Sequence, residues 1–122
     1  MTDKPTTMSV TVSAADEWLR DADRFSGEWQ GAARGSGICV IANSIERPGD
    51  GAKAHQHPYP ETFVIRKGNV RFTIGAETLV CGAGQIVVVP AGVPHAFCNH
   101  GPGPLEMIDI HENGAFDTTW IE

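Results

Sequence analysis

Three histidines and one glutamate have the residue types and the spacing of a metal site. His55 and His57 are two residues apart, Glu61 follows four residues later, and His95 lies further along the chain. Alternate residues of a β-strand point to one face, so the two histidines would share a face with Cα atoms about 6.6 Å apart. At that separation both imidazoles can reach one ion through Nε2–metal bonds of about 2.0–2.1 Å. Glu61 and His95 from neighbouring strands would complete a site with open coordination positions.

Glycines and a proline surround these four residues at regular intervals. Five residues separate Gly49 from His55, and six separate Glu61 from Gly68. In the second stretch, five residues separate Gly84 from Pro90. Gly92, His95 and Asn99 follow, with two residues between Gly92 and His95 and three between His95 and Asn99. The two stretches resemble the two sequence motifs of the cupin superfamily and match every signature position. The resemblance implies an all-β fold, a double-stranded β-helix or jelly-roll barrel, with His55, His57, Glu61 and His95 as ligands of one metal ion.

The ligand set restricts the kind of metal but does not select one. Three imidazoles and a carboxylate suit divalent iron, manganese, nickel, cobalt or zinc, and affinity order alone does not choose among them. A tetrahedral structural zinc is disfavoured because no thiolate belongs to the set. A cation with exchangeable positions can polarise a carbonyl or enolate, acidify water or bind dioxygen.

The bulk properties indicate a single domain that does not bind nucleic acid or an anionic membrane surface. The chain has 122 residues, a formal charge of −6 and a pI near 5.2, and domains commonly contain about 100–150 residues. It contains no basic run, no long apolar segment and no signal-peptide core, so we expect a cytoplasmic protein. Cys39, Cys81 and Cys98 are an odd number without metal-site spacing, which argues against a disulfide framework.

The hydrophobic pattern predicts an N-terminal arm over 1–36 and, in the same domain, a β-barrel over 37–122. In the arm, alternation predicts a strand over 9–13, and a capping box from Ser13 to Asp16 predicts a short helix over 14–22. Within the barrel, strands are expected over 37–45, 53–57, 61–68, 69–80 as a hairpin that turns at Gly75-Ala76, 85–92, 95–99 and 105–111. The apolar run over 86–89 suits a strand that is covered on both faces.

Alternation also predicts which side chains surround the site. Phe63 and Ile65 would point inward with Glu61, and Phe97 with His95, to give a mostly apolar pocket. Val70, Phe72 and Ile74 would form one apolar face, whereas Thr62, Val64 and Arg66 would face outward. Trp29 is interpreted as a core plug rather than a lid.

Few side chains are candidates for acid–base roles beside the metal. They are Tyr59, Asn43, Asp109 and His111; Asp109 and His111 share a strand face, but the pattern leaves open which face, and Tyr59 is interpreted as packing at the rim. Some cupin lyases resemble this motif but have a tyrosine two residues after the glutamate. This chain has Phe63 there, which disfavours their elimination chemistry.

We therefore expect a metal-dependent enzyme that acts on a small organic molecule, with a dioxygenase slightly favoured over an isomerase or lyase. The alternative is a non-catalytic cupin that binds or senses a small ligand. A purely structural barrel would leave the ligand set without a role. We also expect a homodimer, because open barrels have edge strands to cover, with the segment 9–13 as a candidate for exchange between copies.

Overall fold

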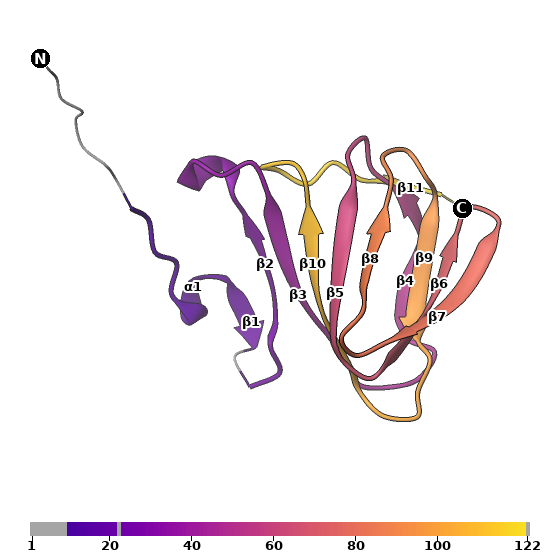
Figure 1. Ribbon diagram of the computed structural model, residues 1–122. Coiled ribbons are helices and arrows are strands. Elements are labelled where there is room, and N and C mark those ends of the chain that lie inside the picture. Colours follow the sequence, from indigo (N-terminus) through magenta and orange to yellow (C-terminus); the bar gives the residue numbers. More distant parts are fainter. Residues whose placement is uncertain (1–9, 22, 122) are drawn as a thin grey trace, which may run out of the picture.

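Two antiparallel sheets form the barrel that the sequence predicts, and they pack face to face (Figure 1). The computed structural model describes residues 10–21 and 23–121. The six-stranded sheet has the order β1-β2-β3-β10-β5-β8, and the five-stranded sheet has the order β11-β4-β9-β6-β7. The all-β jelly-roll architecture with one short N-terminal helix is therefore confirmed.

The first sheet contains strands from both ends and the middle of the chain. In chain order they are β1 (Leu19–Asp21), β2 (Ser26–Gln30), β3 (Cys39–Ile45), β5 (Glu61–Lys67), β8 (Ile86–Val89) and β10 (Leu105–His111). The second sheet contains β4 (Gly51–Gln56), β6 (Asn69–Ile74), β7 (Glu77–Gly82), β9 (His95–Asn99) and β11 (Thr119–Trp120). The helical pieces are α1 (Ala15–Trp18) and a single 3₁₀ turn, η1 (Ala32–Arg34).

The N-terminal arm differs from the sequence prediction. Residues 10–13 form no strand and Ser9 lies outside the described residues, so the predicted strand over 9–13 is wrong where it is described. The helix ends at Trp18 because residues 19–21 pair with β2 instead, and its N-cap is Ala14 without a side-chain hydrogen bond. The capping box at Ser13 is therefore wrong, since the Ser13 hydroxyl accepts a hydrogen bond from Trp29 Nε1 at 2.9 Å.

Strand β2 was not predicted, because Gly27 and polar residues hide its pattern. Gly27 is buried, and a Cβ on it would meet the backbone oxygen of Trp18 at 2.2 Å, so the glycine lets β1 and β2 approach closely. Trp29 pairs with Val40, which lies on the outward face of β3, and the ring is half-buried. It is therefore neither a core plug nor a lid.

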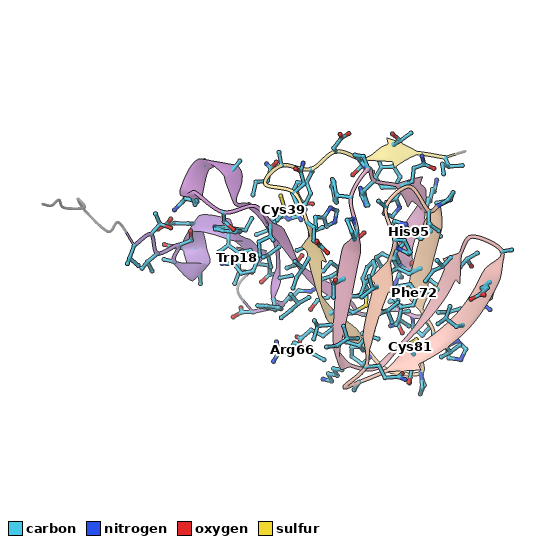
Figure 2. The ribbon with its side chains drawn as sticks, turned by 45° about the horizontal axis from the view of Figure 1, so that its top comes forward. Trp18, Cys39, Arg66, Phe72, Cys81 and His95 are labelled. Atoms are coloured by element: carbon cyan, nitrogen blue, oxygen red, sulfur yellow. The ribbon has the colours of Figure 1, made fainter. Side chains whose placement is uncertain are left out.

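Strand register separates an apolar core from a polar end of the barrel. Along β5 and β10, Met107 is opposite Ile65, Asp109 is opposite Phe63, and His111 is opposite Glu61. The core cluster contains Phe63, Ile65, Val70, Phe72, Cys81, Val89, Phe97, Leu105 and Met107. Figure 2 shows His95, Phe72 and Cys81 following one another from the polar end toward the opposite end. The inward face of β5 and β10 thus begins in the core at Ile65 and Met107 and ends in the site at Glu61 and His111.

Strand β8 corrects a further expectation. Its apolar run predicted cover on both faces, but Ile86 is 63% exposed and Val88 is 57% exposed. Among the described residues β8 pairs only with β5, at the edge of its sheet, and none of them covers the outward side chains of Ile86 and Val88. The hairpin turn at Gly75-Ala76 is confirmed, and Gly75 has the positive φ of 58° that such a turn requires.

Two other expectations concern the cysteines and the membrane. Cys39, Cys81 and Cys98 are all free thiols, so no disulfide joins them. Within residues 10–21 and 23–121, no helix has the length and apolar character needed to cross a membrane.

Candidate metal centre

The four residues singled out from the sequence come together at the polar end of the barrel. His55 is on β4, His57 follows that strand directly, Glu61 begins β5 and His95 begins β9. One donor atom from each lies within 4.8 Å of the other three. None of the four side chains is more than 6% exposed. His55 and His95 are directly opposite each other in the β4–β9 ladder, so strand pairing itself brings two of the imidazoles together.

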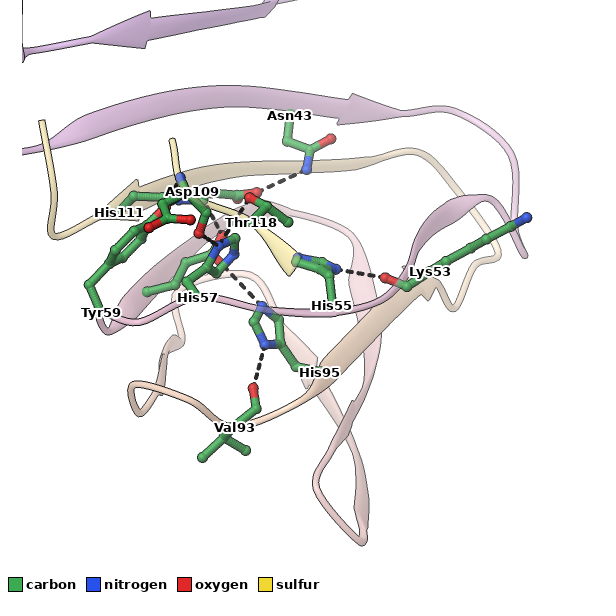
Figure 3. Close-up of polar contacts among 12 residues, drawn as sticks. Asn43, Lys53, His55, His57, Tyr59, Val93, His95, Asp109, His111 and Thr118 are labelled. Atoms are coloured by element: carbon green, nitrogen blue, oxygen red, sulfur yellow. Dashed lines mark hydrogen bonds and ion pairs between the residues drawn. The ribbon is translucent and has the colours of Figure 1, made fainter. Parts of the chain in front are cut away.

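Each of the three imidazoles is held through its Nδ1 atom (Figure 3). His55 Nδ1 contacts the Lys53 carbonyl oxygen at 2.6 Å, and His95 Nδ1 contacts the Val93 carbonyl oxygen at 2.9 Å. His57 Nδ1 lies 3.2 Å from the Asp117 carbonyl oxygen and 3.1 Å from Thr118 Oγ1. A carbonyl only accepts hydrogen bonds, so Nδ1 carries the proton in each ring. The Nε2 lone pair is then directed into the site, as metal-binding histidines require.

These lone pairs converge on a carboxylate. His57 Nε2 and His95 Nε2 each lie 3.1 Å from Glu61 Oε1. The His57 contact is not aligned as a hydrogen bond, and this buried nitrogen has no hydrogen-bond partner within residues 10–21 and 23–121. Lone pairs of nitrogen and oxygen repel at this distance unless a positive species lies between them. The donor set therefore fits a cation.

The pKa shifts follow from the same geometry. Burial alone would raise the pKa of Glu61, but its close contacts with His111, His57 and His95 hold it well below its usual range. Burial lowers the pKa of His55, which keeps that ring neutral. Burial also lowers the pKa of His95. The Glu61 carboxylate and the Val93 carbonyl outweigh burial, so the pKa of His95 is raised overall. Divalent metals bind the ionised form of a carboxylate, which is the form that these contacts favour for Glu61.

His111 is positioned to hold Glu61 rather than to bind the metal. Its Nε2 lies 3.1 Å from Glu61 Oε2, and its Nδ1 lies 2.7 Å from the Tyr59 hydroxyl oxygen. That hydroxyl accepts a hydrogen bond from the Asp117 amide at 3.1 Å, so its own proton is donated to His111 Nδ1. His111 then donates from Nε2 to Glu61. This tautomer is opposite to that of the three candidate ligands, and it leaves Glu61 Oε1 directed toward them.

Asp109 is the most enclosed carboxyl group of the site. It is 1% exposed, and its Oδ2 accepts a hydrogen bond from Asn43 Nδ2 at 3.0 Å, whereas Oδ1 has no hydrogen-bond partner among the residues that the structure describes. Burial and, to a smaller extent, the charge on Glu61 raise the pKa of Asp109 well above its usual range. The sequence did not determine which face of β10 contains Asp109 and His111. In the structure both side chains lie on the inner face.

A cavity of about 390 Å³ adjoins the metal centre. Its walls include His55, His57, Glu61, Asp109 and His111, with Phe97, Phe116 and Trp120 as aromatic surfaces. Of the side chains predicted to line the pocket, only Phe97 does so, because Phe63 and Ile65 lie deeper in the core. A larger depression of about 520 Å³ lies beside it along β3 and β4 and contains none of the four candidate ligands.

Sequence reasoning missed the contribution of the C-terminal segment to the site. Phe116, Thr118 and Trp120 line the cavity. The centroid of the Trp120 ring lies 4.8 Å from that of His55, and the centroid of the Phe116 ring lies 5.1 Å from that of His111. β11 pairs Trp120 with His55, and the Asp117 carbonyl and Thr118 hydroxyl contact His57. Only the aromatic residues in a polar tail could have signalled this role. The backbone atoms of Asp117 that contact His57 and Tyr59 could not be predicted, because every residue type has the same backbone groups.

Comparison with known proteins agrees with this arrangement. The profile of the cupin domain family matches residues 45–111, which is more than half of the 122-residue chain. Mannose-1-phosphate guanylyltransferase ManC of Salmonella typhimurium is 31% identical over 65 residues, covering 52% of this chain and 14% of that protein. Polyketide synthase CurC of Streptomyces cyaneus is 34% identical over 74 residues, covering 60% of this chain and 47% of that protein. The chain thus spans less than half the length of these curated relatives.

Solved structures with the same fold include oxalate decarboxylases. The Bacillus subtilis enzyme at pH 4.6 superposes with a TM-score of 0.70 at 22% identity, covering 78% of this chain and 27% of that one. The Lactobacillus farciminis enzyme in complex with formate gives a TM-score of 0.69 at 20% identity, covering 80% of this chain and 31% of that one. Identities this low show a shared fold and nothing about the reaction.

Proposed function

Since this chain belongs to the cupin domain family, we propose that it is a metal-dependent enzyme that acts on a small organic molecule. The observation that carries the proposal is the convergence of three imidazole Nε2 atoms and the Glu61 carboxylate beside a cavity of about 390 Å³. A purely structural metal has no use for such a cavity. An enzyme needs one, because substrate must reach the ion.

His55, His57, Glu61 and His95 would hold one divalent ion, which is iron, manganese, nickel, cobalt or zinc. The Bacillus subtilis oxalate decarboxylase, which has a similar fold, contains Mn(II) centres. When bound, such an ion supplies Lewis acidity and exchangeable positions for a substrate or dioxygen. The Nδ1 hydrogen bonds would place the proton of each neutral ring on Nδ1, which leaves Nε2 to bind the ion, and burial shields the site from bulk water.

Within this class, oxygenase chemistry is favoured over isomerase or lyase chemistry. Isomerases and lyases need side chains that are free to move protons on the substrate. In this site the Tyr59 hydroxyl and both nitrogens of His111 are already engaged in the hydrogen-bond chain to Glu61. Phe63 is buried in the core and supplies no acid or base. Chemistry that depends mainly on the metal suits these surroundings best.

The second candidate function is binding of a small ligand without turnover, as in a sensor. The same engaged side chains favour it. In the described part of the chain, Asp109 is the only titratable residue of the cavity wall that is buried and has an oxygen atom without a hydrogen bond. Saturable ligand binding with no consumption of ligand or oxygen would distinguish this function from catalysis.

The test is reconstitution of metal-free protein with each of the five divalent ions, followed by oxygen-electrode measurements with a panel of enolisable and aromatic compounds. We expect oxygen uptake that requires iron or manganese and disappears in His57→Ala. His100→Ala is the matched control, since His100 is exposed in the loop after β9 and should leave uptake unchanged. Turnover that needs the metal but not oxygen would overturn the oxygenase assignment alone, whereas metal-independent turnover would overturn the whole proposal.

We further propose that the protein is a homodimer in the cytoplasm and that its partners are small molecules rather than nucleic acid or membranes. The net charge of −6 supports the exclusion of nucleic acid. Three free cysteines suit a reducing compartment. Fractionation of the host cell, with detection of the protein outside the cytoplasm as the contrary result, tests the location.

A further inference from the structure

The C-terminal residues 112–121 lie on the metal centre but are not part of the core, and we call them the C-terminal strap. None of them is buried, and none belongs to the core cluster. Trp120 is 64% exposed, and β11 contributes only two residues to its sheet. Figure 1 shows the strap running from the end of β10 across one end of the barrel to β11. A segment with so little buried surface detaches at a low cost in free energy.

Polar contacts attach the strap to His57 and Tyr59. His57 Nδ1 lies 3.2 Å from the Asp117 carbonyl oxygen and 3.1 Å from Thr118 Oγ1 (Figure 3). The Asp117 amide donates to the Tyr59 hydroxyl oxygen at 3.1 Å. The other ring nitrogen, His57 Nε2, lies 3.1 Å from Glu61 Oε1 in the ligand set. His57 therefore connects the strap to the metal centre, with one ring nitrogen facing each.

The strap also supplies part of the cavity wall. Phe116, Thr118 and Trp120 line the cavity of about 390 Å³, together with His55 and His57. If the strap detaches, these three side chains leave the cavity. The position of the strap therefore decides whether the wall around a bound small molecule is complete.

A bound ion and a docked strap favour each other through the His57 ring. An ion at Nε2 draws electron density from the imidazole, so the Nδ1 hydrogen becomes a stronger hydrogen-bond donor to the strap. In turn, an acceptor at Nδ1 holds the ring in the orientation and tautomer that binding at Nε2 requires. Linkage makes the two effects equal, because the factor by which the ion tightens the strap is the factor by which the strap tightens the ion.

We propose that metal binding closes the C-terminal strap through His57 and thereby completes the wall of the substrate cavity. Asp117 and Thr118 are then positioning residues, because they act on the ion through His57. The inference rests on the proposed metal-dependent function and adds the regulation of that site. It implies an order of binding, in which the ion enters first and the small molecule then meets a complete cavity.

The experiment compares hydrogen–deuterium exchange of the full chain without metal and with one zinc ion per chain, as verified by mass spectrometry. Early exchange times are used, since they report local opening rather than global unfolding. We expect zinc to slow exchange in peptides from the strap by about five- to tenfold, which corresponds to roughly one strengthened hydrogen bond. Peptides from β7, at the edge of the other sheet, should change by less than about twofold.

Replacement of Thr118 by valine tests the route through His57. Thr118→Val removes the hydroxyl that contacts Nδ1 but keeps the β-branched shape. We expect the slowing by zinc to fall to about threefold or less, and the zinc affinity, measured by competition with a chelator, to weaken by the same factor that is lost. Thr118→Ser retains the hydroxyl and should restore both values.

Thr119→Val is the matched control, since Thr119 is an exposed threonine of the same strap that does not line the cavity. It should respond to zinc as wild type does. If Thr118→Val does not fold, Thr118→Ala replaces it. Zinc-loaded wild type whose strap exchanges as fast as without metal, or slows no more than β7, overturns the inference, and so does a full response in the folded Thr118 variant. Failure of wild type to bind zinc would instead overturn the proposed function, so the two failures are distinguishable.

Discussion

At the scale of single residues, the metal-facing atoms are oriented by side chains and carbonyls outside the ligand set. Glu61 illustrates this most clearly, since Oε1 faces two imidazoles while Oε2 accepts from His111. Tyr59 and the Asp117 amide in turn fix the tautomer of His111. The sequence could predict the four donors from their spacing, but not this chain of hydrogen bonds. Tyr59 and His111 are 52 residues apart, and only the fold shows that they touch.

Replacement of Tyr59 by phenylalanine tests the role of this chain. Tyr59→Phe keeps the ring that stacks on His57 but removes the hydroxyl that donates to His111. Because partners of metal ligands typically contribute about 10–100-fold to affinity, we expect cobalt binding to weaken by about tenfold. Competition with a chromophoric chelator measures the change.

His100→Gln is the control for this variant, because it removes an exposed histidine away from the site and should leave the affinity unchanged. An affinity of Tyr59→Phe within twofold of wild type would show that His111 does not depend on the hydroxyl for its orientation.

At the scale of elements, the alternation of apolar residues predicted correctly which side chains lie inside the barrel. The prediction was wrong where pairing between strands outweighs the local preference of the chain for a helix. Strands β3 to β10 follow from alternating apolar residues, β-branched side chains and glycine turns, and their inward residues Phe63, Ile65 and Phe72 are buried as expected. Residues 19–21 were assigned to a helix, but their pairing with β2 prevails. The edge position of β8 is a property of the sheet order, which an apolar run cannot reveal.

Close approach of β4 and β9 is the element-level feature that brings His55 next to His95. A Cβ on Gly51 would lie 2.0 Å from the Phe97 carbonyl oxygen and 2.6 Å from the Cys98 Cα atom. Gly51→Ala must therefore push the two strands apart, and we expect a loss of about 1–3 kcal/mol in the free energy of unfolding. Thermal unfolding with and without cobalt measures it, and the stabilisation by cobalt should also shrink.

Gly37→Ala provides the comparison for that variant. Gly37 has ordinary backbone angles, and an added Cβ would meet no heavy atom within 4 Å, so its melting temperature should stay at or slightly above that of wild type. Equal melting temperatures for Gly51→Ala and wild type would contradict the tight β4–β9 contact.

At the scale of the whole molecule, the outward face of the six-stranded sheet is apolar where it reaches its edge. Ile86 and Val88 on β8 are in register with Val64 and Thr62 on β5. Those two residues are in turn opposite Ile108 and Ile110 on β10. Arg66 and Glu106 on the same face pair at 3.1 Å and so add no net charge. A neutral apolar patch can meet a copy of itself across a two-fold axis without like-charge repulsion.

We therefore expect a homodimer that forms through this patch rather than through exchange of the segment 9–13. Val88→Lys should convert a particle of about twice 13.1 kDa into one of 13.1 kDa, measured by light scattering after size exclusion. Val80→Lys is the control, because Val80 is 49% exposed on β7 of the other sheet and should leave the mass unchanged. A wild-type monomer, or a Val88→Lys dimer, would exclude this interface.

The most direct test of the whole account is X-ray absorption spectroscopy of the protein after reconstitution with cobalt. The geometry predicts one ion per chain with three imidazole nitrogens and a carboxylate oxygen among its nearest neighbours. It also predicts a weaker imidazole signal in His57→Ala, because two rings remain instead of three. A spectrum with no more than one imidazole per cobalt, or a dialysed protein that retains no divalent ion, would contradict it.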